Sequence, residues 1–299
     1  MRRWLSPFAA LIAVAITAAP SLAAAPFPAQ IDLPDGWSPE GITVGRGLTA
    51  YVGSLADGGI AQINLRTGDV NEDFVESASG PAVGIDYEAG ADRLWVAGGP
   101  SGQVRAYDAS SGQLLETYIF SSGFINDVAV TNDAVYATDS FIPQVLVIPL
   151  AAGGGLPDPA DAFTVDIQPP FTYVGGFNAN GIVAFGGWLI IPNSTTGQLF
   201  AVDPTSGRSV ELLPAGSVTF ADGLELVGSS LFVVRNQLAQ IDLYSIRGGA
   251  VPFVATLDTN DLNLEIPTTA AFAGGQLWVV NARFGATDGK YWITRVPMG

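Results

Sequence analysis

One short motif recurs six times along the chain: PEGI at 39–42, VGID at 83–86, INDV at 125–128, ANGI at 179–182, ADGL at 221–224 and PTTA at 267–270. In each copy, polar or small residues introduce an apolar, β-type segment. The copies are spaced by about 42 to 54 residues, which is the repeat length of a β-propeller with one blade per repeat. We therefore expect each copy to begin the innermost strand of a blade and to face the central channel.

Strand and turn signals complete the blades. In the first repeat, residues 41–44, 48–53, 59–65 and 71–76 read as four strands separated by Gly- and Asp-containing turns. The last repeat holds only three, over 269–273, 276–280 and 291–296. Residues 29–33 form a short strand with no other partner, and pairing it there would close the ring and remove an exposed edge. The sequence predicts an all-β, six-bladed propeller with four antiparallel strands per blade.

The first 25 residues are typical of a secretory signal. Arg2 and Arg3 precede an apolar run over 4–19, and small residues offer cleavage after Ala23 or Ala25. The run is short for a membrane span, and no stop-transfer charges follow it. We expect a secreted or periplasmic protein with one domain over 26–299 and no membrane attachment after cleavage. A retained N-terminal anchor is the alternative.

Composition excludes several classes of function. The chain has no cysteine and no histidine, which removes disulfides and the usual ligands of zinc, copper and iron. Its 12 basic and 28 acidic residues give a net charge of −16, and such a surface repels nucleic acid and anionic membranes. A hydrophobic content of 48% with 13% charged residues excludes a disordered chain. We expect a monomer whose partner is a small-molecule substrate or ligand.

Polar residues gather where first strands start and second strands end, and both points lie at the same mouth of a propeller. The first-strand starts carry Glu40, Asn126, Asn180, Asp222 and Thr268, and the second-strand ends carry Ser54, Asp139, Ser140, Asn193, Asn236 and Asn281. Any one of these alone is better explained as a turn or cap residue. Two carboxylates and two amides converging on a narrow channel are costly to bury unless a cation lies between them. Oxygen ligands of this kind favour Ca²⁺.

The Pro-containing segment 168–177 leads directly into the fourth inner strand and should lie at the same mouth. Its aromatic residues Phe171 and Tyr173 are candidates for a pocket wall. The alternative is that they only pack the loop onto the scaffold.

The order of Glu-Gly, Asn-Asp, Asn-Gly and Asp-Gly at successive inner strands resembles the six-bladed calcium propellers of the gluconolactonase and regucalcin (senescence marker protein) superfamily, which is related to diisopropyl fluorophosphatase and paraoxonase. The resemblance implies that Glu40, Asn126, Asn180 and Asp222 bind a catalytic Ca²⁺, with Asn178 as a possible further contact. The chain departs from the family in lacking histidine, since Thr268 occupies the blade-six position, and in lacking a matching arginine for sugar acids.

These residues lead us to expect a Ca²⁺-dependent hydrolase of a lactone or related ester. Asp222 or Glu40 would activate water or attack directly, and Asp127 and Asp139 would orient the metal ligands. Two alternatives remain open: a non-catalytic propeller that binds a ligand or protein partner over a structural Ca²⁺, and an enzyme that cyclises or rearranges its substrate.

Overall fold

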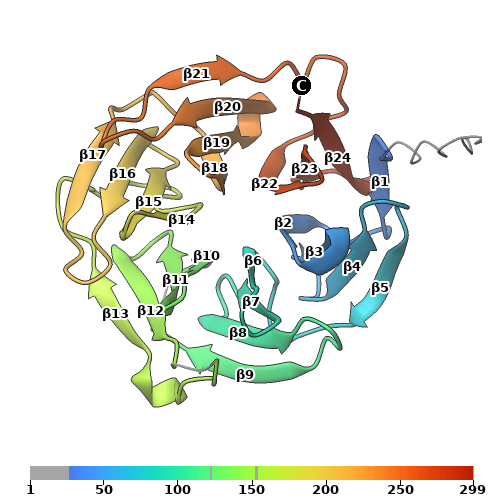
Figure 1. The fold of residues 1–299 in the computed structure, drawn as a ribbon, viewed down its shortest axis with the longest axis horizontal. Helices are drawn as coiled ribbons and strands as arrows, with labels where there is room; N and C mark the ends of the chain where they lie inside the picture. The colour runs from blue at the N-terminus through green and yellow to red at the C-terminus, as the bar shows by residue number, and fades with distance from the viewer. Residues whose placement is uncertain (1–26, 122, 152–153, 299) are drawn as a thin grey trace, which may run out of the picture.

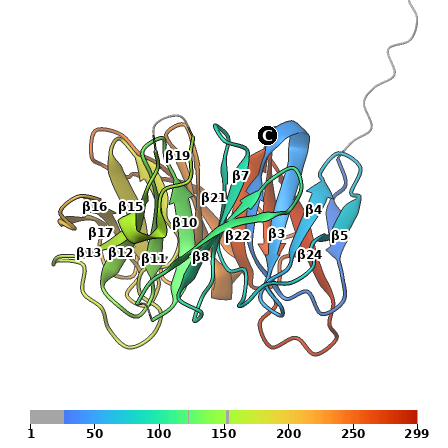
Figure 2. The ribbon, with the colours of Figure 1, turned by 90° about the horizontal axis from the view of Figure 1, so that it is seen from below.

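The computed structural model describes residues 27–121, 123–151 and 154–298, so the predicted signal segment lies outside the described residues. Six four-stranded antiparallel sheets surround a central channel like the blades of a propeller (Figure 1). Seen from the side, the blades form a disc whose strands run between its two faces (Figure 2). The prediction of six four-stranded blades is confirmed.

The first three blades follow the chain from inside to outside. Blade one holds β2 (Pro39–Val44), β3 (Thr49–Ser54), β4 (Ile60–Asn64) and β5 (Val70–Val75). Blade two holds β6 (Ile85–Glu88), β7 (Arg93–Ala97), β8 (Gln103–Asp108) and β9 (Leu114–Ile119). Blade three holds β10 (Ile125–Val130), β11 (Ala134–Asp139), β12 (Gln144–Pro149) and β13 (Phe163–Asp166).

The remaining blades repeat this order, except that the last one borrows a strand. Blade four holds β14 (Val183–Phe185), β15 (Trp188–Asn193), β16 (Gln198–Val202) and β17 (Ser209–Leu213). Blade five holds β18 (Ala221–Val227), β19 (Ser230–Arg235), β20 (Gln240–Ser245) and β21 (Phe253–Thr256). Blade six holds β22 (Pro267–Ala273), β23 (Gln276–Asn281), β24 (Tyr291–Pro297) and β1 (Gln30–Leu33).

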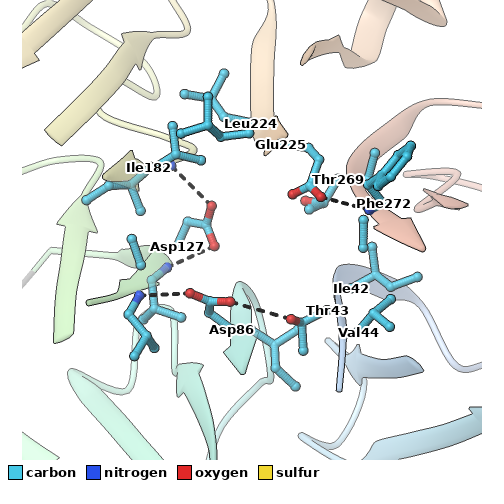
Figure 3. A pocket seen from close by; sticks show the side chains of 18 of the residues that line it. Ile42, Thr43, Val44, Asp86, Asp127, Ile182, Leu224, Glu225, Thr269 and Phe272 are labelled. Atoms are coloured by element: carbon cyan, nitrogen blue, oxygen red, sulfur yellow. Dashed lines mark hydrogen bonds between the residues drawn. The ribbon is translucent and has the colours of Figure 1, made fainter. Parts of the chain in front are cut away.

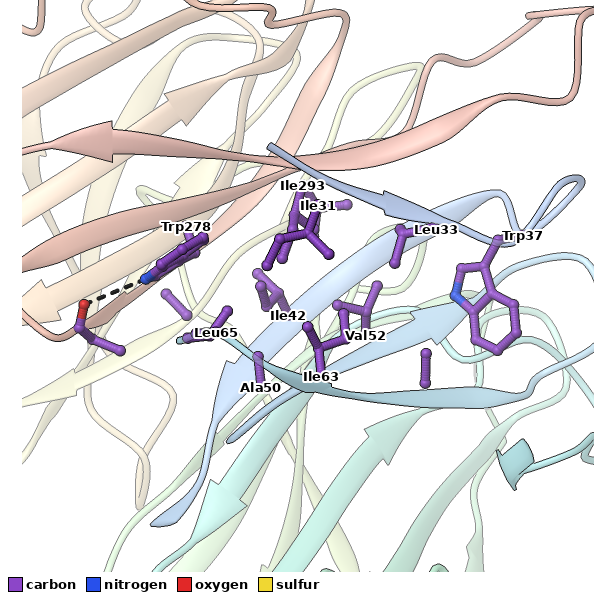
Figure 4. Packing of buried hydrophobic residues seen from close by; sticks show 14 residues of the cluster. Ile31, Leu33, Trp37, Ile42, Ala50, Val52, Ile63, Leu65, Trp278 and Ile293 are labelled. Atoms are coloured by element: carbon purple, nitrogen blue, oxygen red, sulfur yellow. Dashed lines mark hydrogen bonds between the residues drawn. The ribbon is translucent and has the colours of Figure 1, made fainter. Parts of the chain in front are cut away.

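Closure of the ring follows the prediction. β1 pairs antiparallel with β24, with Ile31 opposite Ile293, so an N-terminal strand covers the outer edge of the last blade. The apolar side chains of β1 enter the core between blades six and one, where Ile31 lies beside Ile293 and Leu33 lies near Val52 (Figure 4). The closing strand therefore contributes both backbone pairing and packing.

Buried apolar side chains lie between the blades rather than at the centre of the ring. Each of the six core clusters joins residues from two neighbouring blades. In β7, Leu94 and Val96 pack toward blade one, while Trp95 and Ala97 pack toward blade three. Alternate residues of a strand point to opposite faces, so strands buried on both faces read as continuous apolar runs. This sandwiching explains the β-branched and aromatic residues of the second strands.

Short helices are confined to connections: η1 (Arg46–Leu48), η2 (Pro159–Asp161) and η3 (Asn236–Leu238). In the part of the chain that the structure describes, no helix has the length and apolar character needed to cross a membrane.

Candidate functional site

Irregular strand pairing marks the start of four inner strands. The register between the first and second strands shifts over residues 39–42, 125–128, 221–224 and 267–270. A β-bulge places two residues opposite one and turns their side chains out of the regular alternation. Glu40, Asn126, Asp222 and Thr268 each lie within such a bulge. In these four blades the local geometry therefore aims a polar residue at the channel.

Three of these residues, Glu40, Asn126 and Asp222, together with Asn180, line one pocket of about 510 Å³, which we call the site pocket. Its lining combines the predicted metal ligands with hydroxyl, amide and apolar side chains: Glu40, Leu55, Val83, Phe124, Asn126, Phe177, Asn180, Ser194, Thr195, Phe220, Asp222, Asn236, Gln237 and Phe284. Glu40, Asn126, Asn180 and Asp222 are all buried. The structure thus brings together the four residues that the sequence singles out.

Close contacts between neighbouring inner strands hold these residues in place. The Thr268 hydroxyl donates to the Glu40 carbonyl over 2.7 Å and joins blade six to blade one. The backbone N–H of Gly181 donates to the Asp222 carbonyl over 3.0 Å and joins blade four to blade five. A Cβ on Gly181 would lie 2.4 Å from that same oxygen, so only glycine permits the approach. The channel is narrow because the inner strands touch directly.

Hydrogen bonds orient the amide groups of the site. Nδ2 of Asn126 donates to the Ser140 hydroxyl over 2.9 Å, which leaves Oδ1 of Asn126 available to the pocket. Nδ2 of Asn236 donates to Oδ2 of Asp222 over 2.6 Å. Asn180 also donates a side-chain hydrogen bond to Asp222. Because the N–H groups are directed at these acceptors, the groups left for a ligand are mainly oxygens.

Burial and charge act in the same direction on the two carboxylates. Desolvation raises the pKa of Asp222 to about 7, although the hydrogen bonds from Asn236 and Asn180 oppose this rise. The pKa of Glu40 is raised well above its ordinary value, first by burial and then by the charges of Asp222 and Asp127. Burial without a compensating positive charge disfavours the charged carboxylates. The two acids therefore tend to bind a proton or a cation.

The donor set of the site pocket fits a hard divalent cation. Its potential ligands are two carboxylates and two amides, all oxygen donors of the kind that Ca²⁺ binds. Among the described residues, no lysine or arginine lines the pocket to neutralise the acids. No cluster of three or more His, Cys, Asp or Glu side chains suited to a metal occurs in the described part of the chain, so a metal here would depend on the amides.

Three other predicted site residues hold loops instead of facing the pocket. Asn178 donates from Nδ2 to three backbone carbonyls and accepts from Val174 N–H at 2.8 Å. Oδ1 of Asn193 caps the backbone N–H groups of Thr195 and Thr196. Asn281 bridges Glu265 N–H to the Trp292 carbonyl. For these three residues the capping explanation describes what their side chains do.

Of the two alternatives for Phe171 and Tyr173, the structure supports packing of the loop onto the scaffold, since neither ring lines the site pocket. Phe171 is 2% exposed and stacks on Phe200 with ring centroids 4.4 Å apart. The Tyr173 hydroxyl donates to the Asp139 carbonyl over 2.7 Å. Packing between blades removes the large apolar surface of these rings from water, which is more favourable than leaving the rings exposed at the rim of the pocket. The rings that line the pocket are instead Phe124, Phe177, Phe220 and Phe284.

The carboxylates of Asp127 and Asp139, which the sequence predicts to orient the metal ligands, make their hydrogen bonds mainly to backbone N–H groups. The Asp139 carboxylate accepts backbone N–H groups from the flanking loops, including those of Phe124 and Phe141. Asp127 follows Asn126 in the same bulge, but its side chain faces the other end of the channel. It accepts hydrogen bonds from the N–H groups of Val128 and Ile182, and the bond from Ile182 joins blades three and four.

A second cavity of about 310 Å³, here called the opposite pocket, lies at that other end. Three carboxylates face it, and each accepts a backbone N–H from a neighbouring blade (Figure 3). Asp86 accepts from Val130 at 2.8 Å, Asp127 from Ile182 at 3.2 Å and Glu225 from Phe272 at 2.8 Å. Burial raises the pKa of Asp86 to about 6 and those of Asp127 and Glu225 to about 7. These acids link neighbouring blades, and the charge of Asp127 also raises the pKa of Glu40 in the site pocket.

Comparison with solved structures confirms the propeller fold. A streptogramin B lyase matches with 14% identity over 88% of this chain and 95% of that chain, with a TM-score of 0.62. A virginiamycin B lyase from Staphylococcus aureus matches with 13% identity over 89% and 98%, with a TM-score of 0.56. A chain of a nidogen/laminin complex matches with 15% identity over 75% and 82%, with a TM-score of 0.58.

No protein-family model and no curated protein sequence matches the chain. At these identities the structural likeness shows the fold alone, and propellers carry many unrelated functions. The resemblance to the gluconolactonase and regucalcin superfamily remains a prediction from the inner-strand motifs.

Proposed function

We propose that the protein is a Ca²⁺-dependent hydrolase that acts on a lactone or related ester in the site pocket. The observation that carries the proposal is the burial of Glu40 and Asp222 together, with two amides, on the wall of a pocket of about 510 Å³. Such a pocket is large enough for a small substrate beside the polar groups. Glu40, Asn126, Asn180 and Asp222 would hold the ion.

When bound, Ca²⁺ would polarise the substrate carbonyl and stabilise negative charge on its oxygen. Asp222 is held by Asn236 and Asn180 in one orientation, which places its carboxylate to accept a proton from a water in the pocket. The Glu40 carboxylate accepts no hydrogen bond from the described residues, so it is the less constrained of the two acids. Either acid would take the proton from the attacking water.

The reaction adds the oxygen of water to the acyl carbon and breaks the acyl carbon–oxygen bond. The proton taken by the carboxylate passes to the leaving oxygen, so a lactone gives a hydroxy acid and an ester gives an acid and an alcohol. Asn126 and Asn180 do not titrate and would serve only to bind and orient.

A screen of lactones, aryl esters and phosphotriesters, run with Ca²⁺ and with chelator, tests the proposal. We expect turnover that chelator abolishes, and loss of at least 100-fold in Asp222→Asn or Glu40→Gln, depending on which acid accepts the proton. Asp73→Asn, an exposed change on β5, is the matched control. Product masses distinguish hydrolysis, which adds one water, from a rearrangement or elimination, which adds none.

A non-catalytic binding propeller is the second candidate. It is favoured by one observation: Phe141, Phe177, Phe220 and Phe284 are all more than 40% exposed. Exposed aromatic side chains often mark contact surfaces. Ligand binding at this mouth without turnover of any compound in the screen would select this candidate.

A further inference from the structure

Every blade contributes one apolar side chain to the site pocket, and these six residues form what we call the apolar ring: Leu55, Val83, Phe124, Phe177, Phe220 and Phe284. We infer that the apolar ring selects an uncharged ligand or substrate with an extended apolar group, and that Phe177 and Phe220 determine this specificity. As a statement about substrates the inference rests on the proposed function, whereas as a statement about binding it does not.

The rings on one side of the pocket form a packed wall. Phe124 lies edge-on to Phe177, with centroids 5.4 Å apart and an interplanar angle of 87°. Phe141 supports both, at 5.9 Å from Phe124 and 4.9 Å from Phe177. Aromatic groups in such contacts hold one another in place and present a fixed apolar surface. Although Phe177 contributes to this wall, 44% of its surface is exposed and can still be covered by a ligand.

Phe220 is held over the pocket against its backbone preference. Its φ of 62° lies in the left-handed region, where a bulky side chain is uncommon. The backbone is fixed there by two hydrogen bonds, from Phe220 N–H to the Ser194 carbonyl and from Asn236 N–H to the Phe220 carbonyl. Backbone strain of this kind clusters at ligand sites. With 43% of its surface exposed, the Phe220 ring gains little from burial in the unliganded protein.

Asp139 positions the aromatic wall. Its fully buried carboxylate accepts the backbone N–H groups of Gly123, Phe124, Phe141 and Ile142 at 2.8 to 3.1 Å, and Nε2 of Gln144 at 3.1 Å. One carboxylate thus fixes the two loops that carry Phe124 and Phe141. The position of Asp139 at the end of a second strand does not by itself predict that its carboxylate holds these two loops.

Charge argues against an acidic ligand. The pocket is lined by two buried carboxylates, and no lysine or arginine lines it among the described residues. The nearby Arg283, which precedes Phe284, is occupied by ion pairs with Glu265 and Asp288. The two carboxylates would cancel the charge of a bound divalent cation, and a carboxylate or phosphate group on the ligand would find no positive side chain to pair with. An uncharged apolar group would instead cover ring surface that is exposed to water.

Two ligand series test the inference. p-Nitrophenyl esters from acetate to decanoate report on catalysis, and linear methyl ketones of the same lengths, titrated by calorimetry, report on binding without reaction. We expect kcat/KM and ketone affinity to rise on the order of three- to fourfold for each added methylene until the ring is filled. Phe177→Ala and Phe220→Ala should flatten this dependence. Phe163→Ala, which removes a similarly exposed ring from outer strand β13, should not.

Asp139→Asn tests the positioning role. If the variant is folded by circular dichroism, it should lose the chain-length dependence of KM while keeping kcat for the acetate ester. A purely structural defect would lower kcat for the acetate ester as well as remove the chain-length dependence of KM.

The outcomes separate the two proposals. Length-dependent ketone binding without hydrolysis of any ester would support the apolar ring and contradict the hydrolase. Hydrolysis in which acetate is the best substrate, together with ketone affinity independent of length, would overturn the apolar ring and leave the hydrolase standing. Equal effects of Phe163→Ala and Phe177→Ala would also overturn it.

Discussion

Asn236 donates a hydrogen bond from its side-chain amide to Oδ2 of Asp222 over 2.6 Å, and the two residues lie at the open end of one β-hairpin. Asp222 lies in the bulge of β18, and Asn236 follows the end of β19. The pairing of these two strands therefore brings a carboxylate and its orienting amide to the same mouth of the channel. Oδ1 of Asn236 is fixed in turn by the N–H of Gln237 at 2.6 Å, so the amide cannot turn freely.

Replacing Asn236 with alanine should weaken calcium binding without removing a ligand. Residues that orient metal ligands typically contribute about 10- to 100-fold to affinity, and Asp222 would lose its shortest hydrogen bond. We expect the Kd for Ca²⁺, measured by calorimetry, to rise at least about tenfold. Asn71→Ala, an exposed change on β5, should leave the Kd unaltered. An unchanged Kd in Asn236→Ala would show that Asp222 needs no such support.

Calcium should stabilise the folded protein, because the ligands converge only in the closed ring. Binding to the native state alone at 100 times Kd adds about 2.7 kcal/mol to the free energy of unfolding. For a domain of this size that corresponds to a rise in Tm of roughly 5 °C. Differential scanning calorimetry with Ca²⁺ and with chelator measures it. Superimposed curves, together with no calcium on elemental analysis, would exclude the metal site.

The ring should depend on its N-terminal strand. Ile31 is 3% exposed in the cluster between blades six and one, so Ile31→Ala should lower the free energy of unfolding by about 2–4 kcal/mol. Gln30→Ala, on the exposed face of the same strand, should change it by less than about 0.5 kcal/mol. Deleting residues 26–33 should in addition expose the edge of β24 and cause aggregation, seen by light scattering. A deletion variant with the melting curve of the mature chain would refute this closure.

The repeat motif is sufficient to predict the six blades and the convergence of Glu40, Asn126, Asn180 and Asp222, and the missing fourth strand of the last repeat predicts the closing strand. All of these follow from periodicity, because equivalent positions in a closed ring must face the same axis. The motif does not predict which way Asp127 points. In a bulge two successive residues leave the regular alternation, so adjacent side chains such as Asn126 and Asp127 can reach opposite pockets.

The aromatic lining could not be assigned from composition, because loop rings either pack inward or face the mouth according to backbone geometry. Phe171 is buried on Phe200, whereas Phe124 and Phe220 line the pocket. One signal was available in the sequence: Phe124 and Phe220 each stand two residues before the polar residue of their motif. The equivalent spacing in different blades indicates an equivalent place at the mouth.

Close contact between inner strands predicts that glycines differ in how much their replacement by alanine destabilises the fold. A Cβ on Gly41 would lie 2.3 Å from the Val83 carbonyl oxygen, so Gly41→Ala must push blades one and two apart. We expect a loss of about 1–3 kcal/mol or more in the free energy of unfolding, measured in urea. Gly90, in the turn between β6 and β7, has open space around its Cα, and Gly90→Ala should be neutral or stabilising by up to about 1 kcal/mol. Equal stability of the two variants would contradict direct contact at the channel.

The carboxylates of the opposite pocket predict that stability falls as pH rises. Burial raises the pKa of Glu225 to about 7, while in the unfolded chain it should lie near 4.3. A folded-state pKa above the unfolded one gives stability that is complete below the unfolded pKa and is lost as pH rises through about 7. Asp86 and Asp127, which face Glu225 across the pocket, have raised pKa values and act in the same direction.

Glu225→Gln isolates this contribution, because glutamine can still accept from Phe272 N–H but carries no charge. In urea unfolding with chelator present, the variant and the parent should be equally stable at pH 4, and the variant should be more stable by about 1–3 kcal/mol at pH 8. The exposed change Glu72→Gln on β5 should leave the profile of the parent unchanged. Parallel profiles for Glu225→Gln and the parent from pH 4 to 8 would mean that the Glu225 carboxylate is not destabilised by burial, and that the fall in stability has another source.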